Sequence, residues 1–175
     1  MGQQKSANRV RASLAHTSGE LAVDFGATPV SGMHVTIVHE LRKHLGLPAK
    51  PVRVTEPYQM LGEIDDELAD AVGVDTVGVP GPRTIFGFAN EHWREWKSPW
   101  GIEVLVPESF CVKSEGEDLL IFPEGDTNAP ASGRLPSGGY YFDSIVRQGT
   151  LDDLQPADNL EEFQPLTDSD IDYYD

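Results

Sequence analysis

The sequence has one cysteine, few basic residues and no long apolar run, and each of these shortages excludes a class of protein. Cys111 is the only cysteine among 175 residues, which excludes an internal disulfide and a zinc site built from thiolates of this chain alone. A single cysteine is typical of proteins from a reducing compartment, so we expect a cytoplasmic location. No apolar stretch approaches the roughly 20 residues that a membrane-spanning helix requires.

Basic residues are scarce relative to acidic ones. There are 13 Lys and Arg residues and 29 Asp and Glu residues, which gives a formal net charge of −16. Such a surface repels the phosphates of nucleic acids and anionic lipids, so we expect neither a nucleic acid nor a membrane as partner. The length suits a single domain with a hydrophobic core.

The first 79 residues alternate between two apolar spacings, one typical of helices and one typical of strands. The expected elements are a helix over residues 6–16, a strand over 21–25, a helix over 31–46, a strand over 52–55, a helix over 57–73 and a strand over 76–79. Strands that alternate with helices run parallel and are joined by right-handed crossovers. The pattern therefore predicts an α/β fold with parallel strands.

The rest of the sequence predicts β-hairpins. Residues 96–100 and 102–106 flank a turn signal at 99–101. Residues 109–113 and 119–122 flank the polar, glycine-containing stretch 114–118. We therefore divide the chain into three parts. They are a helix with β/α units over 6–79, an insertion of hairpins and loop over 80–158, and an acidic tail over 159–175 that begins a helix.

Polar side chains directly follow the predicted parallel strands. Asp24 ends the first strand, Glu56, Tyr58 and Gln59 follow the second, and Arg83 follows the third. Ligands of parallel α/β proteins bind at the carboxyl ends of the strands. We therefore expect these five side chains to line a substrate-binding pocket for a charged small molecule. The alternative is that the carboxylates only cap helices or pair with Arg83.

Three histidines recur at five-residue intervals, but this spacing does not suit a metal site. On a helix, each interval rotates His34, His39 and His44 by about 500°, so they do not share one face. The zinc-protease motif needs histidines at positions i and i+4. We therefore expect no metal site and no cofactor in this chain. Gly-x-Ser-x-Gly and phosphate-loop motifs are also absent, so the catalytic residues stay unassigned.

Several stretches together resemble the uroporphyrinogen decarboxylase superfamily, in particular its methyltransferase-like and uncharacterised branches. The longer stretches are Ala22-Val23-Asp24-Phe25-Gly26, Glu56-Pro57-Tyr58-Gln59-Met60-Leu61, Val74-Asp75-Thr76-Val77-Gly78-Val79 and Tyr140-Tyr141-Phe142-Asp143. Others lie at 8–14, 86–88, 104–107 and 158–163. The resemblance covers nearly the whole chain and rests on the order and spacing of these stretches.

The resemblance implies a (β/α)8 TIM barrel, of which this chain would form the N-terminal part. It implies cobamide-dependent methyl transfer, in which zinc and a corrinoid belong only to a full-length relative and this chain is inactive alone. Uroporphyrinogen decarboxylation is an alternative. The resemblance implies that such an enzyme holds the substrate carboxylates with arginines after the first strand and needs an aspartate after the third. Here residues 24–32 contain no basic residue, and Gly81-Pro82 contains no carboxylate. A further alternative is a non-catalytic binding module that forms a homo-oligomer or docks with a C-terminal half.

Overall fold

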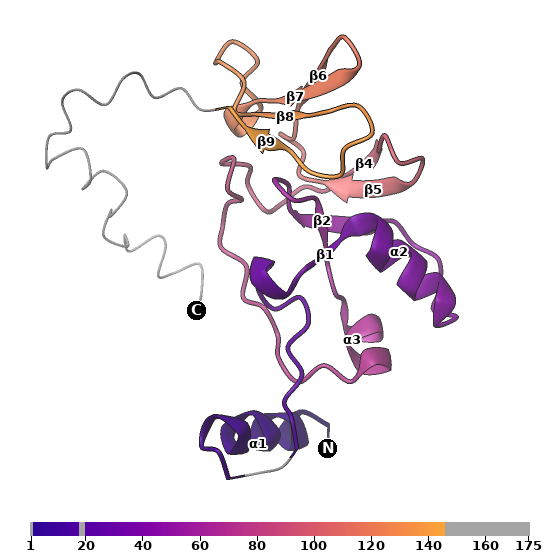
Figure 1. Cartoon of the computed structure of the whole chain (residues 1–175), viewed down its shortest axis with the longest axis vertical. Coiled ribbons are helices and arrows are strands. Elements are labelled where there is room, and N and C mark those ends of the chain that lie inside the picture. The colour runs from indigo at the N-terminus through magenta and orange to yellow at the C-terminus, as the bar shows by residue number, and fades with distance from the viewer. Residues whose placement is uncertain (1, 18–19, 146–175) are drawn as a thin grey trace, which may run out of the picture.

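The computed structural model describes residues 2–17 and 20–145, which form a sheet-rich molecule with few helices (Figure 1). The helices are α1 (Gly2–Leu14), α2 (Val35–His44) and α3 (Asp66–Val72), with short 3-10 turns η1 (Pro29–Ser31) and η2 (Pro123–Gly125). The strands are β1 (Met33–His34), β2 (Val52–Glu56), β3 (Leu61–Gly62), β4 (Arg94–Lys97), β5 (Glu103–Val106), β6 (Val112–Glu115), β7 (Asp118–Ile121), β8 (Gly133–Leu135) and β9 (Asp143–Ser144).

The strands form two sheets. The first has the order β1-β3-β2-β5-β4, in which β2 and β5 are parallel and the other neighbours are antiparallel. The second has the order β6-β7-β8-β9 and is antiparallel throughout. Among the described residues, β2–β5 is therefore the one parallel strand pair.

The predicted barrel-like (β/α)8 fold with parallel strands is wrong. Residues 21–25 and 76–79 form no strand, although they lie beside one another and the Asp75 amide donates to the Val23 carbonyl at 2.8 Å. The Val23 amide donates to the Asp75 carboxylate at 3.0 Å instead of to a backbone carbonyl. Because the Asp75 side chain, and not a backbone carbonyl, accepts the hydrogen bond of the Val23 amide, a ladder of backbone hydrogen bonds does not form here.

The predicted helix over 57–73 is correct only in its second half. The Glu56 carboxylate accepts hydrogen bonds from the amides of Tyr58 and Gln59, both at 2.8 Å, and Met60 has a φ of +54°. These contacts turn the chain back, so that β3 pairs with β2. The helix then begins at Asp66 and ends, as predicted, at Gly73, whose φ is +82°.

The helix predicted over 31–46 is confirmed, but it begins later than expected. Ser31 lies in η1, and His34 caps α2 by accepting the Thr36 amide. Gly46 adopts the expected positive φ, +69°.

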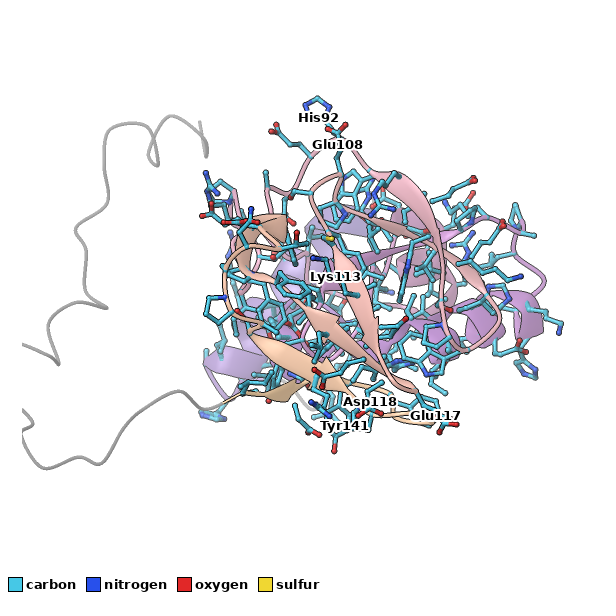
Figure 2. All side chains as sticks on the ribbon, turned by 90° about the horizontal axis from the view of Figure 1, so that it is seen from above. His92, Glu108, Lys113, Glu117, Asp118 and Tyr141 are labelled. Carbon is cyan, nitrogen blue, oxygen red and sulfur yellow. The ribbon has the colours of Figure 1, made fainter. Side chains whose placement is uncertain are left out.

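Both predicted hairpins are confirmed. Strands β4 and β5 pair across the turn at 98–101, and β6 and β7 pair as far as Glu115 and Asp118, which leaves Gly116-Glu117 as the turn. Figure 2 shows Glu117 and Asp118 at one edge of the molecule, while Lys113 projects from β6. The predicted acidic tail over 159–175 lies outside the described residues.

The two sheets share one hydrophobic core with α2 and α3. Its buried members are Val35, Val38, Val52, Val54, Met60, Leu68, Phe88, Val104, Val106, Phe110, Ile121, Leu135 and Phe142. Phe88 and Phe110 lie with ring centroids 5.6 Å apart, and Trp96 approaches Phe110 at 5.1 Å. Ile121 and Leu135 of the second sheet belong to the same core as the valines of the first sheet. None of the described helices has the length and apolarity to span a bilayer.

An aromatic cluster of His34, Trp100 and Tyr140 connects β1 with the segment that precedes β9. The ring of His34 lies edge-on to Trp100 at 4.6 Å and to Tyr140 at 5.3 Å, and Trp100 donates from Nε1 to the Gly139 carbonyl at 2.9 Å. Nδ1 of His34 accepts the Thr36 amide at 3.3 Å, an arrangement that assigns the proton of the neutral ring to Nε2. Protonation of Nδ1 would remove this helix cap.

We expect His34 to make the protein less stable as the pH falls from about 7.5 to 5.5. Burial lowers the pKa of His34 below its usual 6.5, and a contact with the Tyr140 backbone opposes this shift only in part. The unfolded chain therefore takes up a proton in this range while the folded chain does not, which favours unfolding. The thermal unfolding midpoint of a His34→Gln variant should depend less on pH than that of the wild type. Substitution of the exposed His44 by Gln is the control, and an equal pH dependence in all three proteins would contradict this assignment.

Candidate functional site

The described residues enclose a cleft of about 660 Å³ between three stretches of the chain. One wall comes from residues 25–32, the second from residues 55–69 and the third from residues 74–90. Apolar side chains dominate much of the lining. They include Phe25, Leu61, Ile64, Val74, Val77, Val79 and Ile85. A volume of this size is typical of sites for small organic molecules, which occupy roughly 300–1,000 Å³.

The structure brings four of the five predicted site residues to this cleft. Glu56, Tyr58 and Gln59 line it from the second wall, and Arg83 lines it from the third. Asp24 lies just outside the lining. It accepts a hydrogen bond of 2.8 Å from the hydroxyl of Thr76, which does line the cleft. This hydrogen bond lowers the pKa of the Asp24 carboxyl, although burial opposes the shift.

Glu56 stands at the end of β2, where the chain turns back into β3. Its two carboxylate oxygens accept the amides of Tyr58 and Gln59, so the side chain is held in a fixed position. Partial burial raises the pKa of the Glu56 carboxyl, although these two backbone hydrogen bonds oppose the shift. Each carboxylate oxygen retains a second acceptor position for a ligand.

Arg83 lies on a small internally bonded loop at the rim of the cleft. The guanidinium donates to the Gly87 carbonyl at 3.0 Å and lies 3.5 Å from Glu124, while 61% of the side chain stays exposed. Asn90 closes the base of the loop, with its side chain donating to the Gly81 carbonyl at 2.6 Å. The loop therefore presents Arg83 from a defined backbone.

Two glycines allow the walls to approach one another. A Cβ on Gly26 would lie 2.3 Å from Cγ1 of Ile64, and Gly26 has a φ of +81°. A Cβ on Gly78 would lie 2.5 Å from the Ala27 carbonyl oxygen. Because a backbone oxygen cannot swing aside as a flexible side chain can, larger residues at Gly78 would push the first and third walls apart.

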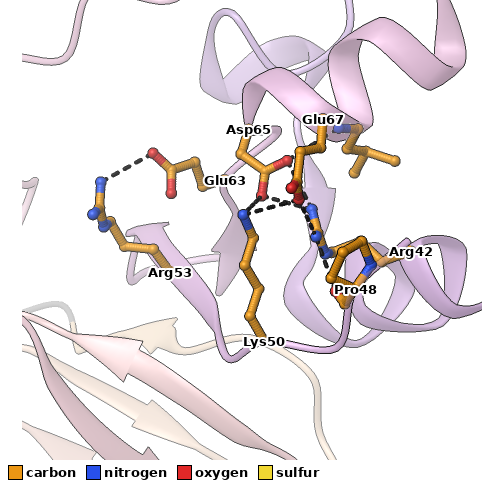
Figure 3. A network of polar contacts seen from close by, with 8 residues as sticks. Arg42, Pro48, Lys50, Arg53, Glu63, Asp65 and Glu67 are labelled. Atoms are coloured by element: carbon orange, nitrogen blue, oxygen red, sulfur yellow. Dashed lines mark hydrogen bonds and ion pairs between the residues drawn. The ribbon is translucent and has the colours of Figure 1, made fainter.

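A network of charged side chains supports the second wall (Figure 3). Arg42 of α2 donates to Asp65 at 2.6 and 2.7 Å and to Glu67 at 2.7 Å. Lys50 approaches the same carboxylates at 2.9 and 3.2 Å. Burial opposes the ionisation of Asp65, but hydrogen bonds from Lys50 and the Leu68 amide and the charge of Arg42 outweigh it and lower its pKa.

The sequence-based prediction missed three acidic residues of the second wall. Glu63, Asp65 and Asp66 line the cleft, whereas the prediction placed them inside a helix. A signal for the true helix start was present, because Asp65 accepts the Leu68 amide at 3.0 Å as an N-cap and acidic residues follow it. Thr84 was also missed, and its hydroxyl is buried without a hydrogen-bond partner among the described residues.

The part of the chain that the structure describes contains no group of three or more His, Cys, Asp or Glu side chains placed to hold a metal ion. The described residues therefore do not form the zinc site that the family resemblance implies for its methyltransferases.

Comparison with known proteins found no similar protein. No protein-family model, no curated protein and no solved structure matches the chain.

Proposed function

We propose that this chain binds a small organic molecule in its cleft and provides substrate recognition for an enzyme related to the uroporphyrinogen decarboxylase superfamily. The observation that carries the proposal is that Glu56, Tyr58, Gln59 and Arg83 line one cavity of about 660 Å³. Apolar walls with a few polar groups are typical of small-molecule sites. The proposed role of these residues is binding, and the chemical step is not assigned to them.

For the chemistry, we propose methyl transfer rather than uroporphyrinogen decarboxylation. A tetrapyrrole that carries many carboxylates would meet a cleft lined by four carboxylates and one guanidinium, in a chain of net charge −16. The preference for methyl transfer is supported by the sequence motifs and by this charge. We propose the cytoplasm as the location, a choice supported by the single Cys111.

Docking of another protein, the alternative role, has weaker support. Its main argument is exposed apolar surface, and Val77, Val79 and Ile85 are 87%, 75% and 70% exposed. All three line the cleft, so a bound ligand accounts for their exposure. Leu14, Leu21 and Val30 are 76%, 84% and 96% exposed and do not line the cleft, so a ligand there accounts for only part of the exposed apolar surface.

A substitution that fills the cleft tests the proposal. Thr28 lines the cleft, is exposed and makes no side-chain capping bond to η1, so Thr28→Trp should occupy the cavity without disturbing the core. Small organic compounds that bind the wild-type chain in ligand-detected NMR should bind this variant at least about tenfold more weakly. Thr17→Trp, on an exposed residue that follows α1, is the matched control. Equal binding by all three proteins, or no binding by the wild type across a broad set of small organic compounds, would refute a ligand site here.

A further inference from the structure

The charged side chains that line the cleft leave a surplus of negative charge. The cleft is lined by the carboxylates of Glu56, Glu63, Asp65 and Asp66 and by one guanidinium, that of Arg83. Arg83 already lies beside the Glu124 carboxylate at 3.5 Å. The lining therefore contains more negative than positive charge.

Asp65 and Glu63 each pair with basic side chains that do not line the cleft. Asp65 pairs with Arg42 and Lys50, and Glu63 pairs with Arg53 at 3.0 Å. No cation among residues 2–17 and 20–145 pairs with the remaining two carboxylates, Glu56 and Asp66. The unmatched charge in the cleft is thus concentrated at these two positions.

Glu56 is the better placed of the two for binding a ligand. It is partly buried, whereas Asp66 is exposed at the first turn of α3. Its orientation is fixed by the two backbone amides that it accepts at 2.8 Å. Removing a carboxylate from water is costly unless a cation or further donors are supplied. Within the described residues, this carboxylate receives donors but no cation.

We propose that the ligand of the cleft is a small organic ammonium compound, whose cationic group lies at Glu56 and whose apolar body lies against Phe25, Ile64 and Val77. The inference rests on the proposed function and names the ligand class for that site. The apolar lining suits a hydrocarbon or aromatic body, and the ammonium supplies N–H donors for the free acceptor positions of Glu56. The net charge of −16 also concentrates cations near the protein.

Three probes that share one body and differ in charge test this inference on the unmodified chain. They are phenethylammonium, the neutral 2-phenylethanol and the anionic 3-phenylpropionate, each titrated into the protein with detection by calorimetry and NMR. We expect phenethylammonium to bind about tenfold more tightly than 2-phenylethanol, and 3-phenylpropionate to bind most weakly. Because no variant is needed, the result does not depend on the folding of a mutant.

A conservative substitution then identifies the residue responsible. Glu56→Gln should abolish the tenfold preference for the cation while 2-phenylethanol still binds, and Glu95→Gln, on an exposed residue of β4, should retain the preference. Weaker binding of the same compounds by the Thr28→Trp variant shows that they bind in the cleft. If 2-phenylethanol or 3-phenylpropionate binds the cleft as tightly as phenethylammonium, the ligand class is wrong while the small-molecule site stands. If none of the three probes binds, the ligand class is also rejected, and the broader compound set decides the proposed function separately.

Discussion

Replacing Arg42 by Met is expected to lower the free energy of unfolding by about 3 kcal/mol. Arg42 is only 3% exposed, and its guanidinium donates to Asp65, Glu67 and the Pro48 carbonyl. Removing it leaves the partly buried Asp65 with Lys50 as its remaining cation. The cost arises mainly at Asp65, which is only 21% exposed and loses its buried partner, whereas Glu67 is 47% exposed and regains water.

Urea denaturation of the wild-type and variant proteins measures this loss. Lys43→Met is the matched control, since Lys43 is the next residue of α2 and is 74% exposed with one surface ion pair at 3.6 Å. Its expected effect is below about 0.5 kcal/mol. If the two variants were equally stable, the network would be a surface feature with no role in holding α2 to α3. Because Asp65 lines the cleft, Arg42→Met should also weaken ligand binding.

Replacing Phe142 by Ala is expected to cost about 4 kcal/mol. The Phe142 side chain is completely buried, its ring lies 6.5 Å from that of Phe86, and its amide donates to the Tyr58 carbonyl at 2.8 Å. It therefore joins the second sheet to the turn that carries Glu56. The substitution would open a cavity at this junction.

The adjacent aromatic residue gives the control for this prediction. Tyr141 is 56% exposed, and Tyr141→Ala should change the free energy of unfolding by less than about 0.5 kcal/mol. Thermal and chemical unfolding of both variants provide the measurement. A loss below about 1 kcal/mol for Phe142→Ala would show that this ring is not part of a tightly packed core.

The sequence pattern predicted local elements well where neighbouring residues alone decide them. The apolar stripe of α2, the glycine that ends α3 and the turn residues of both hairpins act over a few positions, so their signals were sufficient. The core strand β2 was also predicted, because its valines alternate with polar residues.

The parallel-strand prediction failed because it depended on pairing between distant residues. Residues 76–79 form a continuous apolar run, which is typical of a buried strand, yet Val77 and Val79 line the cleft with most of their surface exposed. Likewise, β2 pairs with β5 across the sequence and with β3 through a turn that Glu56 makes. Neither partner can be identified from the spacing of apolar residues.

The residues proposed for the site were derived from a fold that is wrong, and their role in binding stays a prediction. Glu56, Tyr58, Gln59 and Arg83 were chosen as residues after parallel strands, and they line one cleft although most of those strands do not exist. Glu63, Asp65 and Asp66 were missed because the turn after Glu56 could not be foreseen from helical periodicity.

The most direct test of this account is the two-dimensional ¹H–¹⁵N spectrum of the labelled chain during titration with phenethylammonium. The amides of Tyr58 and Gln59 donate to the carboxylate that would receive the cation, so they should show the largest shifts. Shifts spread instead over exposed acidic residues such as Glu95 and Glu117, with none at Tyr58 and Gln59, would contradict a ligand site at Glu56.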